Sequence, residues 1–371
     1  MKAKTIARSC LAAALILVFA HDAAATGQAS EESWRTLDQA KHAYEKRSFD
    51  EALRLVDSAR AAHRARIESD RDILSKAVLS GEPKKAGDDL VAVYRALKKR
   101  GNADAIAVLD RIYLTREPYD FGNSLTRLLG WLDGRLEYPE ADALAGMIYK
   151  SEGEYSVAMT FLKKAWDARR NLDIPDESYG IAYAMADIAE ARGDHGVREE
   201  CLLLVLTDDA VYGLPGKESS TLLAMTHSLK VDPSLTKFFF LYRNDRLVAL
   251  KAYQDLARHY QESGRIDRAY PVAVLAAITS LTVLEKHLRS VDFQYAYSSF
   301  EDLMQRSSKN AKLAQWARDQ RAWDSFLVLS SIMWENGERE QAKYLWNSLA
   351  ANCPESAVAR RASGALALRE R

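Results

Sequence analysis

The sequence has 371 residues, of which 48% are hydrophobic and 28% are charged. These proportions predict a folded protein, because a disordered chain lacks the apolar side chains that offset the entropy lost on ordering. The 52 basic and 52 acidic residues cancel, so the chain has no overall positive field that would attract nucleic acid or an anionic membrane surface. We therefore do not expect nucleic acid as a partner.

Residues 1–25 have the pattern of a cleavable export signal. Three basic residues precede or flank the start of the apolar run Cys10–Ala20, and three alanines end at Ala25. The run is shorter than the roughly 20 residues that a membrane span needs, which favours cleavage over a retained anchor. We expect cleavage after Ala25, no stable membrane span in the mature chain, and a periplasmic or secreted location.

The rest of the chain has the apolar pattern of helices. From Trp34 to Leu368, apolar side chains recur at helical spacing, and alternating runs rich in Val, Ile and Thr are scarce. This pattern predicts an all-α protein. The later apolar run Pro271–Leu284 is too short to span a bilayer and is followed by Glu285 and Lys286, which favours a helix buried in the protein.

A recurring arrangement of small and aromatic residues is clearest in the segment 146–165. Its positions are Gly146, Tyr149, Gly153, Tyr155, Ala158, Leu162 and Ala165. We expect Gly146 and Ala158 to face each other where two helices cross, because larger residues would push the helix axes beyond about 8 to 10 Å. Gly153 is expected to end the first helix, since glycine adopts a positive φ more readily than other residues.

Other segments repeat this arrangement. Good copies lie at residues 40–59, where Arg47 takes the place of the turn glycine, and at 257–276 and 330–354. Two degraded copies surround Gly101 and Gly193, and the second has Arg198 at an alanine position. The arrangement resembles the tetratricopeptide repeat over about half to two thirds of the mature chain. The resemblance implies a right-handed superhelical solenoid of antiparallel helix pairs, but it implies little about function.

The last copy of the repeated arrangement indicates the cellular location of the protein. A Cys-Pro-Glu-Ser turn at Cys353–Ser356 precedes an alanine-rich segment. This is similar to a repeat variant of bacterial envelope-assembly proteins, in which a Tyr-Pro-x-Ser turn precedes such a helix, although cysteine replaces the tyrosine here. Together with the export signal, the similarity implies the bacterial periplasm.

A loop-rich stretch divides the repeats into two groups. The segment Thr207–Ser220 is rich in Gly, Pro, Asp and Ser, which is typical of loops. We predict N-terminal repeats over residues 26–206, a loop and connecting helices over 207–244, and C-terminal repeats over 245–371. Because the units of an array contact only their neighbours, Cys201 and Cys353 are not expected to form a disulfide.

Three consecutive phenylalanines, Phe238, Phe239 and Phe240, lie in the connecting segment. They cannot all point to one side of a helix, so at least one is expected to be exposed or covered by another element. Core packing of this stretch is favoured over a patch for lipid or a partner.

No motif for catalysis, cofactor binding or metal binding is complete in the sequence. The stretch Gly213–Ser219 lacks the first glycine of a phosphate-binding loop and has Glu218 where Ser or Thr must bind magnesium. No two histidines lie within four residues, and the two cysteines of the mature chain have no CxxC spacing. Glu-Ser dipeptides such as that at Glu262 lack the segment that follows the catalytic glutamate in wall lytic enzymes. We expect no catalytic residue, no cofactor, no metal and no enzymatic activity.

Candidate partner-binding residues lie on the first helix of each repeat. In the tetratricopeptide family this helix lines the concave surface, and exposed Trp, Tyr, Met and Arg are enriched at protein interfaces. The positions predicted to face away from the second helix are Trp34, Lys41, Met147, Lys150, Tyr183, Asp187, Lys251, Gln254, Arg258, Leu327 and Trp334. The alternative that most of them only pack or are solvated stays open.

Three roles are compatible with these features. The first is a periplasmic scaffold or adaptor that holds envelope proteins or peptides on a curved helical surface, without chemistry of its own. The second is a solute-binding or transport-accessory protein, and the third, less favoured, is a cell-wall-active enzyme. A continuous aromatic groove would favour the adaptor, whereas a pocket lined by convergent polar groups would favour solute binding. The oligomeric state is left open.

Overall fold

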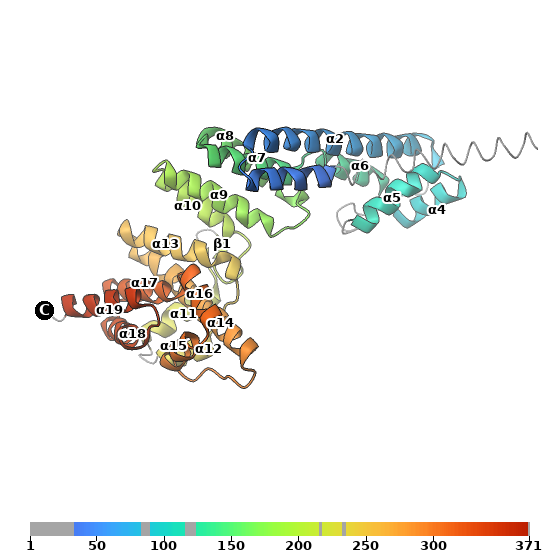
Figure 1. The fold of residues 1–371 in the computed structure, drawn as a ribbon. Helices are drawn as coiled ribbons and strands as arrows, with labels where there is room; N and C mark the ends of the chain where they lie inside the picture. The colour runs from blue at the N-terminus through green and yellow to red at the C-terminus, as the bar shows by residue number, and fades with distance from the viewer. Residues whose placement is uncertain (1–32, 83–89, 116–123, 215–216, 232–234, 370–371) are drawn as a thin grey trace, which may run out of the picture. The chain divides into compact units, whose positions relative to one another are not determined.

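The computed structural model describes residues 33–82, 90–115, 124–214, 217–231 and 235–369. Most of these residues are helical, so the prediction of an all-α protein is confirmed. The predicted export signal lies outside the described residues. The chain divides into two compact units, the first ending at Ile188 and the second beginning at Ala189 (Figure 1).

The first unit begins with a helix through residues 33–45. It continues with α2 (Phe49–Leu79), α4 (Leu90–Lys99), α5 (Ala103–Thr115), α6 (Leu125–Gly134), α7 (Pro139–Glu152), α8 (Tyr155–Asp167), the short 3-10 helix η2 (Arg169–Asn171) and most of α9 (Glu177–Ala191). Helix α2 has 31 residues. A repeat of about 34 residues cannot contain α2 together with a second helix of ordinary length, so α2 departs from the predicted repeat.

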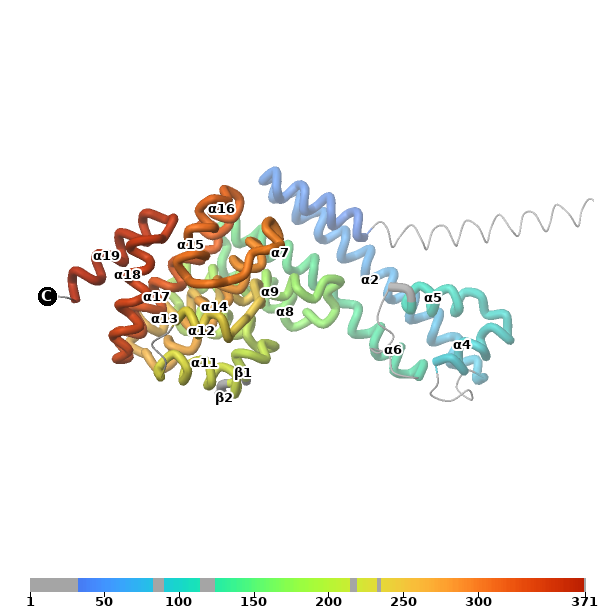
Figure 2. Tube along the Cα trace, turned by 90° about the horizontal axis from the view of Figure 1, so that it is seen from below, coloured from blue at the N-terminus to red at the C-terminus, as the bar shows by residue number. Residues whose placement is uncertain are grey.

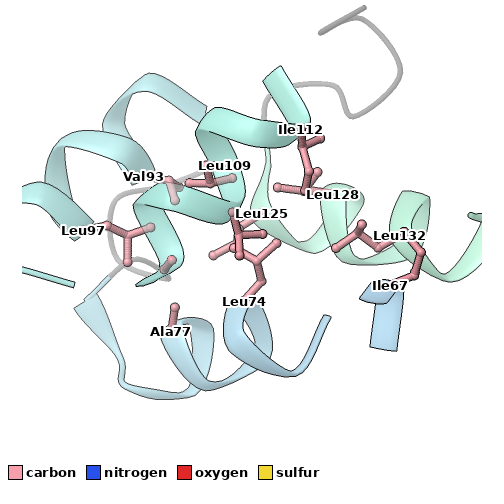
Figure 3. Close-up of a cluster of buried hydrophobic side chains, with 12 residues drawn as sticks. Ile67, Leu74, Ala77, Val93, Leu97, Leu109, Ile112, Leu125, Leu128 and Leu132 are labelled. Atoms are coloured by element: carbon pink, nitrogen blue, oxygen red, sulfur yellow. The ribbon is translucent and has the colours of Figure 1, made fainter. Parts of the chain in front are cut away.

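Helix α2 contributes to two separate hydrophobic cores. Its first half packs Ala52, Val56 and Ala59 against α7 and the helix through residues 33–45. Its second half packs Leu74 and Ala77 against α4, α5 and α6, as Figure 3 shows. One continuous helix therefore connects the two cores of the first unit.

The predicted close approach within the pair α7 and α8 is confirmed. A Cβ atom added at Gly146 would lie 2.6 Å from Leu162 Cγ and 3.2 Å from the Ala158 carbonyl oxygen, so a larger residue does not fit without movement. Gly153 follows α7 with a φ of 84°, as predicted for a helix-ending glycine. Arg47 adopts the same left-handed conformation, with a φ of 59°, at the turn before α2.

The second unit contains the end of α9 and a longer series of elements. These are α10 (His195–Val205), strands β1 (Gly213–Leu214) and β2 (Lys217–Glu218), α11 (Ser220–Val231), α12 (Leu235–Leu241), the 3-10 helix η3 (Leu247–Ala249), α13 (Leu250–Glu262), α14 (Ile266–Val291), α15 (Phe300–Ser308), α16 (Ala311–Asp319), α17 (Ala322–Glu335), α18 (Arg339–Asn352) and α19 (Ser356–Arg369). The two strands pair antiparallel over two residues each and do not change the fold class.

Helix α14 forms the centre of the second unit. It packs against α13 and α17, and also against α11 and α15 (Figure 2). Every residue of the run Pro271–Leu284 is buried, as predicted. Within the described ranges, α14 is the one helix long and apolar enough to cross a membrane, and 83% of its apolar window is buried in the protein.

The three phenylalanines of α12 divide as predicted. Phe238 and Phe239 are buried, and the ring of Phe239 lies 5.6 Å from that of Phe300 and 5.7 Å from that of Phe326. Phe240 points outward, with 63% of its surface exposed. Elsewhere in the second unit, Cys201 is buried and forms no disulfide with Cys353.

Candidate functional site

A polar pocket of about 550 Å³ lies beside α13 in the second unit. Its lining comes from the end of α9, from α10 and α13, and from the turn between α16 and α17. The lining residues are Glu190, Arg198, Lys251, Gln254, Asp255, Arg258, Glu262, Asp319, Gln320 and Arg321. We call this site the α13 pocket.

Helix α13 supplies one polar face to the pocket. Lys251, Gln254 and Arg258 follow one another at intervals of three and four residues, which places them on the same side of a helix. The opposite face buries Tyr253 and Ala257 in the unit. The three residues that the sequence predicted on this helix are therefore brought together by the structure.

Gln254 connects α13 to the turn between α16 and α17. Its amide Nε2 donates to the carbonyl oxygen of Gln320 at 2.9 Å and lies 2.8 Å from the Ser325 hydroxyl. Its Oε1 accepts a hydrogen bond from Arg321 Nη2 at 3.3 Å. Because Gln254 is buried, these bonds satisfy a polar group that would otherwise destabilise the pocket floor.

Arg321 forms one wall of the pocket, and its backbone adopts an unfavourable conformation. Its φ is 49°, a left-handed value that costs a non-glycine residue about 1–2 kcal/mol. Its guanidinium donates to Asp255 Oδ1 at 2.7 Å, and Arg198 Nη2 lies 3.7 Å from the other oxygen of the same buried carboxylate. Residues in such conformations persist where their surroundings hold them, as Gln254 and Asp255 do here.

Arg258 is the third arginine of the pocket. It pairs with Asp324, whose carboxylate also accepts a hydrogen bond from Arg361 at 2.7 Å. Burial lowers the pKa of Arg258, and the neighbouring positive charge of Arg321 lowers it further. Arginine nevertheless keeps its proton in proteins, so the pocket retains a partly desolvated cation at this point.

The lining offers charges of both signs. Four of its residues are basic and four are acidic, and the remaining two are glutamines. Most small-molecule sites are mainly apolar with a few polar groups. The α13 pocket is polar throughout, so it is suited to a ligand with its own donors, acceptors and charges.

The predicted residues of the first unit lie outside this pocket. Lys150 of α7 forms an ion pair with Asp187 of α9, with 2.7 Å between Nζ and Oδ2. Met147 and Tyr183 on the same two helices are half-buried, and Lys41 is exposed. Trp34 has 62% of its surface exposed and lines a different cavity.

Two predicted residues of α17 are engaged within the second unit. Leu327 is buried, with 4% of its surface exposed, so the expectation that it faces a partner is wrong. Helix α17 packs against α14 and α18 and also contacts α13, α16 and α19, which leaves Leu327 no open face. The half-buried Trp334 packs on Trp346, with 5.6 Å between ring centroids, and the guanidinium of Arg369 lies over its ring.

Several pocket residues were not predicted from the sequence. For Arg198 the sequence contained one indication of a role outside the repeat pattern, because this arginine replaces a small residue in a degraded copy of the repeat. Asp319 ends α16, and Gln320 and Arg321 lie between α16 and α17, where no repeat pattern applies, so only the three-dimensional arrangement places these residues beside α13. As for metals, the described part of the chain has no group of three or more His, Cys, Asp or Glu residues positioned to hold an ion.

Comparison with known proteins identifies a relative that is similar to this chain in sequence. The chain is 36% identical over 338 residues to an uncharacterized protein of Treponema pallidum (strain Nichols). The aligned residues cover 91% of this chain and 90% of the relative, so the similarity extends over both units. No family model matches the chain.

Proposed function

This chain and its Treponema pallidum relative belong to one family, and on that premise we propose that the chain is an exported, non-catalytic binding protein of the bacterial cell envelope. Its scaffold is a solenoid of antiparallel helix pairs of the tetratricopeptide type. The pairs α7 and α8, α13 and α14, and α17 and α18 support this proposal, because a left-handed glycine lies in each turn. The export pattern of residues 1–25 supports the location.

The observation that best supports a binding role is the α13 pocket. Lys251, Gln254 and Arg258 converge there with two further arginines, and the site has a volume of about 550 Å³. Convergent polar groups favour a polar ligand over an apolar partner surface. Among the three roles considered from the sequence, solute binding is therefore the one that this geometry supports best.

The pocket also indicates what kind of solute it would take. Its floor is formed by the buried side chains of Gln254 and Asp255, and its rim contains the exposed side chains of Lys251, Glu262 and Asp319. A ligand with one sign of charge would meet repulsion from four of the eight charged residues that line the pocket. We infer a zwitterionic or neutral polar ligand, such as an amino acid or a short peptide.

An adaptor that binds a peptide segment of an envelope protein is the second candidate. The charges along α13 alternate in sign through Lys251, Asp255, Arg258 and Glu262, which suits an extended chain with mixed charges. The exposed rim allows such a chain to continue beyond the pocket. Both candidate functions use the α13 pocket, and they differ in the size of the ligand that enters it.

The test is site-specific photocrosslinking in intact cells. A photoreactive amino acid replaces Lys251 at the rim, and in a matched control it replaces Lys41, which is exposed in the first unit. We expect an adduct from position 251 that position 41 does not give and that the Arg258→Glu substitution removes. Mass spectrometry of the adduct distinguishes a small solute from an envelope protein.

The possible outcomes separate the roles. A low-mass adduct supports solute binding, and a protein adduct supports the adaptor. A glycan fragment at position 251, accompanied by cleavage of isolated cell wall, would support a wall-active enzyme and overturn the proposal. The proposal also fails if positions 251 and 41 give the same adducts.

A further inference from the structure

The second unit contains another cavity, with a volume of about 680 Å³. It lies where the end of α14, the loop 292–299, α15 and the start of α16 meet, and these three helices pack on one another (Figure 2). Most of its lining residues are exposed, so it is a shallow groove and not an enclosed pocket. We call it the α15 groove.

Apolar side chains form part of the α15 groove. Leu288 and Tyr295, both buried, line it together with Val291, which is 70% exposed. Phe293 lies between the lining residues Asp292 and Tyr295 in the chain and is 88% exposed. Single exposed apolar residues are common on soluble proteins. Here two of them occur within three residues beside an open groove, which favours an interaction surface.

The charges that line the groove do not balance. They belong to three basic residues and two acidic ones. Arg306 neutralises both acids, since its Nε donates to Asp302 at 2.9 Å and its Nη1 lies 3.7 Å from Asp292. Neither Lys309 nor Lys312 forms an ion pair with a residue in the described part of the chain. The groove therefore has a local excess of positive charge, although the charges of the whole chain cancel.

The shape and composition of the α15 groove favour a broad surface over a small molecule. A small-molecule site buries most of its ligand, and a groove with mainly exposed lining residues does not. Exposed apolar side chains next to lysines are typical of proteins that bind the surface of a bilayer. In such binding the apolar groups enter the boundary between headgroups and acyl chains, and the cations attract anionic lipids.

We propose that the α15 groove binds the surface of a bilayer that contains anionic phospholipids. Val291 and Phe293 enter the headgroup boundary, and Lys309 and Lys312 pair with lipid phosphates. A lysine can lay its long apolar stem along an apolar surface while its amine stays among the headgroups. This contact is peripheral and requires no membrane-spanning helix.

Helix α16 connects the α15 groove to the α13 pocket. Lys312 lies near its start and lines the groove, whereas Asp319 ends the helix and lines the pocket. Nine residues of α-helix span about 13 Å. A protein bound through the α15 groove would therefore hold the α13 pocket close to the bilayer. The two sites share no residue, so the failure of one proposal leaves the other unaffected.

Flotation of the mature full chain with lipid vesicles tests the proposal. One set of vesicles contains phosphatidylcholine and phosphatidylglycerol, and the other contains phosphatidylcholine alone. We expect a partition coefficient about tenfold or more higher for the anionic set, because each lysine near an anionic surface contributes about fivefold. The coefficient should fall as salt is added, since salt screens exposed charges. Soluble glycerol 3-phosphate, which has the phosphate of the lipid without its acyl chains, should not compete.

A pair of lysine variants connects the binding to the charges of the groove. Lys309→Gln combined with Lys312→Gln is expected to lower the partition coefficient about twentyfold. Lys41→Gln combined with Lys46→Gln removes the same charge from exposed positions of the first unit and should leave the coefficient unchanged.

A pair of apolar variants tests the other half of the contact. Phe293→Ser is expected to lower the partition coefficient about tenfold, because the aromatic ring no longer enters the headgroup boundary. Leu368→Ser, at an apolar position of α19 that is also exposed and does not line the groove, should leave it unchanged. Because these residues are exposed, the thermal midpoints of all the variants should stay near that of the wild type.

Three results would overturn the proposal. They are equal partition onto the two sets of vesicles, equal effects of a groove variant and its control, and full competition by glycerol 3-phosphate. The last result would mean that the groove takes a soluble anion and not a bilayer. Arg258→Glu, which alters the α13 pocket, should leave the partition coefficient unchanged.

Discussion

At Gly146 the missing side chain sets the distance between α7 and α8. A methyl group there would lie 2.6 Å from Leu162 Cγ, closer than carbon atoms approach without displacement. We expect Gly146→Ala to lower the free energy of unfolding by about 1–3 kcal/mol, the usual range for overpacking. Urea denaturation of the purified chain measures this difference.

Gly130 is a matched control for this substitution. It lies in α6, is exposed, and would have no atom within 4 Å of an added Cβ. Gly130→Ala should therefore raise the free energy of unfolding by up to about 1 kcal/mol, because alanine favours the helix. Equal effects of the two substitutions would contradict the close approach at Gly146.

His63 makes the stability of the first unit depend on pH. Burial lowers the pKa of His63 below 6.5, the value it would have when unfolded. The unfolded chain therefore binds a proton at a pH where the folded chain does not, so the free energy of unfolding should fall as the pH drops below about 6.5. The slope from one such group is at most about 1.4 kcal/mol per pH unit.

The His63→Gln variant isolates this contribution. Glutamine has an amide that can still donate to the Arg135 carbonyl oxygen, which lies 2.9 Å from His63 Nε2, but it has no proton to gain. Thermal melts between pH 7.5 and 5.5 should show a smaller loss of stability for His63→Gln than for the wild type. Parallel curves for the two proteins would exclude His63 as the group responsible.

Single residues of the repeat were predictable because close backbone contact requires them. Gly146 and Gly153 were placed correctly, since few other residues fit those positions. Arg321 was not predicted, because nothing in its local sequence demands a left-handed conformation. Its φ depends on Gln254 and Asp255, which lie far from it in the chain.

Among the elements, α12 has a buried and an exposed phenylalanine side by side. Phe239 has no exposed surface and contacts the rings of Phe300 and Phe326. We expect Phe239→Ala to lower the free energy of unfolding by about 3–5 kcal/mol through the cavity it leaves. Phe240→Ala should change it by no more than about 0.5 kcal/mol. Chemical denaturation of both variants provides the comparison, and a larger effect at Phe240 would contradict the orientation of α12.

The success of prediction differed between two helices of the second unit. On α13, helical spacing placed Lys251, Gln254 and Arg258 on one face, and that face lines a pocket. On α17, the same reasoning placed Leu327 away from α18, but it could not reveal that other helices cover that side. Helical register therefore predicted which residues share a face, and not what that face meets.

At the scale of the whole molecule, the chain has two units with separate buried residues. Leu128 belongs to a core of the first unit and Leu281 lies in α14 of the second, both without exposed surface. Each leucine-to-alanine substitution should lower the stability of its own unit by about 2–5 kcal/mol. Hydrogen exchange followed by mass spectrometry should show faster exchange in α5 and α6 for Leu128→Ala, and in α13 and α14 for Leu281→Ala.

The alternative is a single cooperative structure. In that case, either substitution would speed exchange equally in both units. The sequence predicted the helical class of the whole chain from the spacing of its apolar residues. It did not predict the length of α2 or α14. A helix that is longer than a helix of the predicted repeat keeps the same spacing of apolar residues, so no feature of the local sequence indicates its greater length.

The continuity of α2 has a consequence for how this family can change during evolution. Adding one residue near the middle of α2 would rotate its second half by about 100° and shift it by about 1.5 Å relative to the first. Ala52, Val56 and Ala59 would then keep their core while Leu74 and Ala77 lost theirs. Length changes in this helix should therefore be tolerated only in steps of about seven residues, two full turns, whereas the connections between helices can vary more freely.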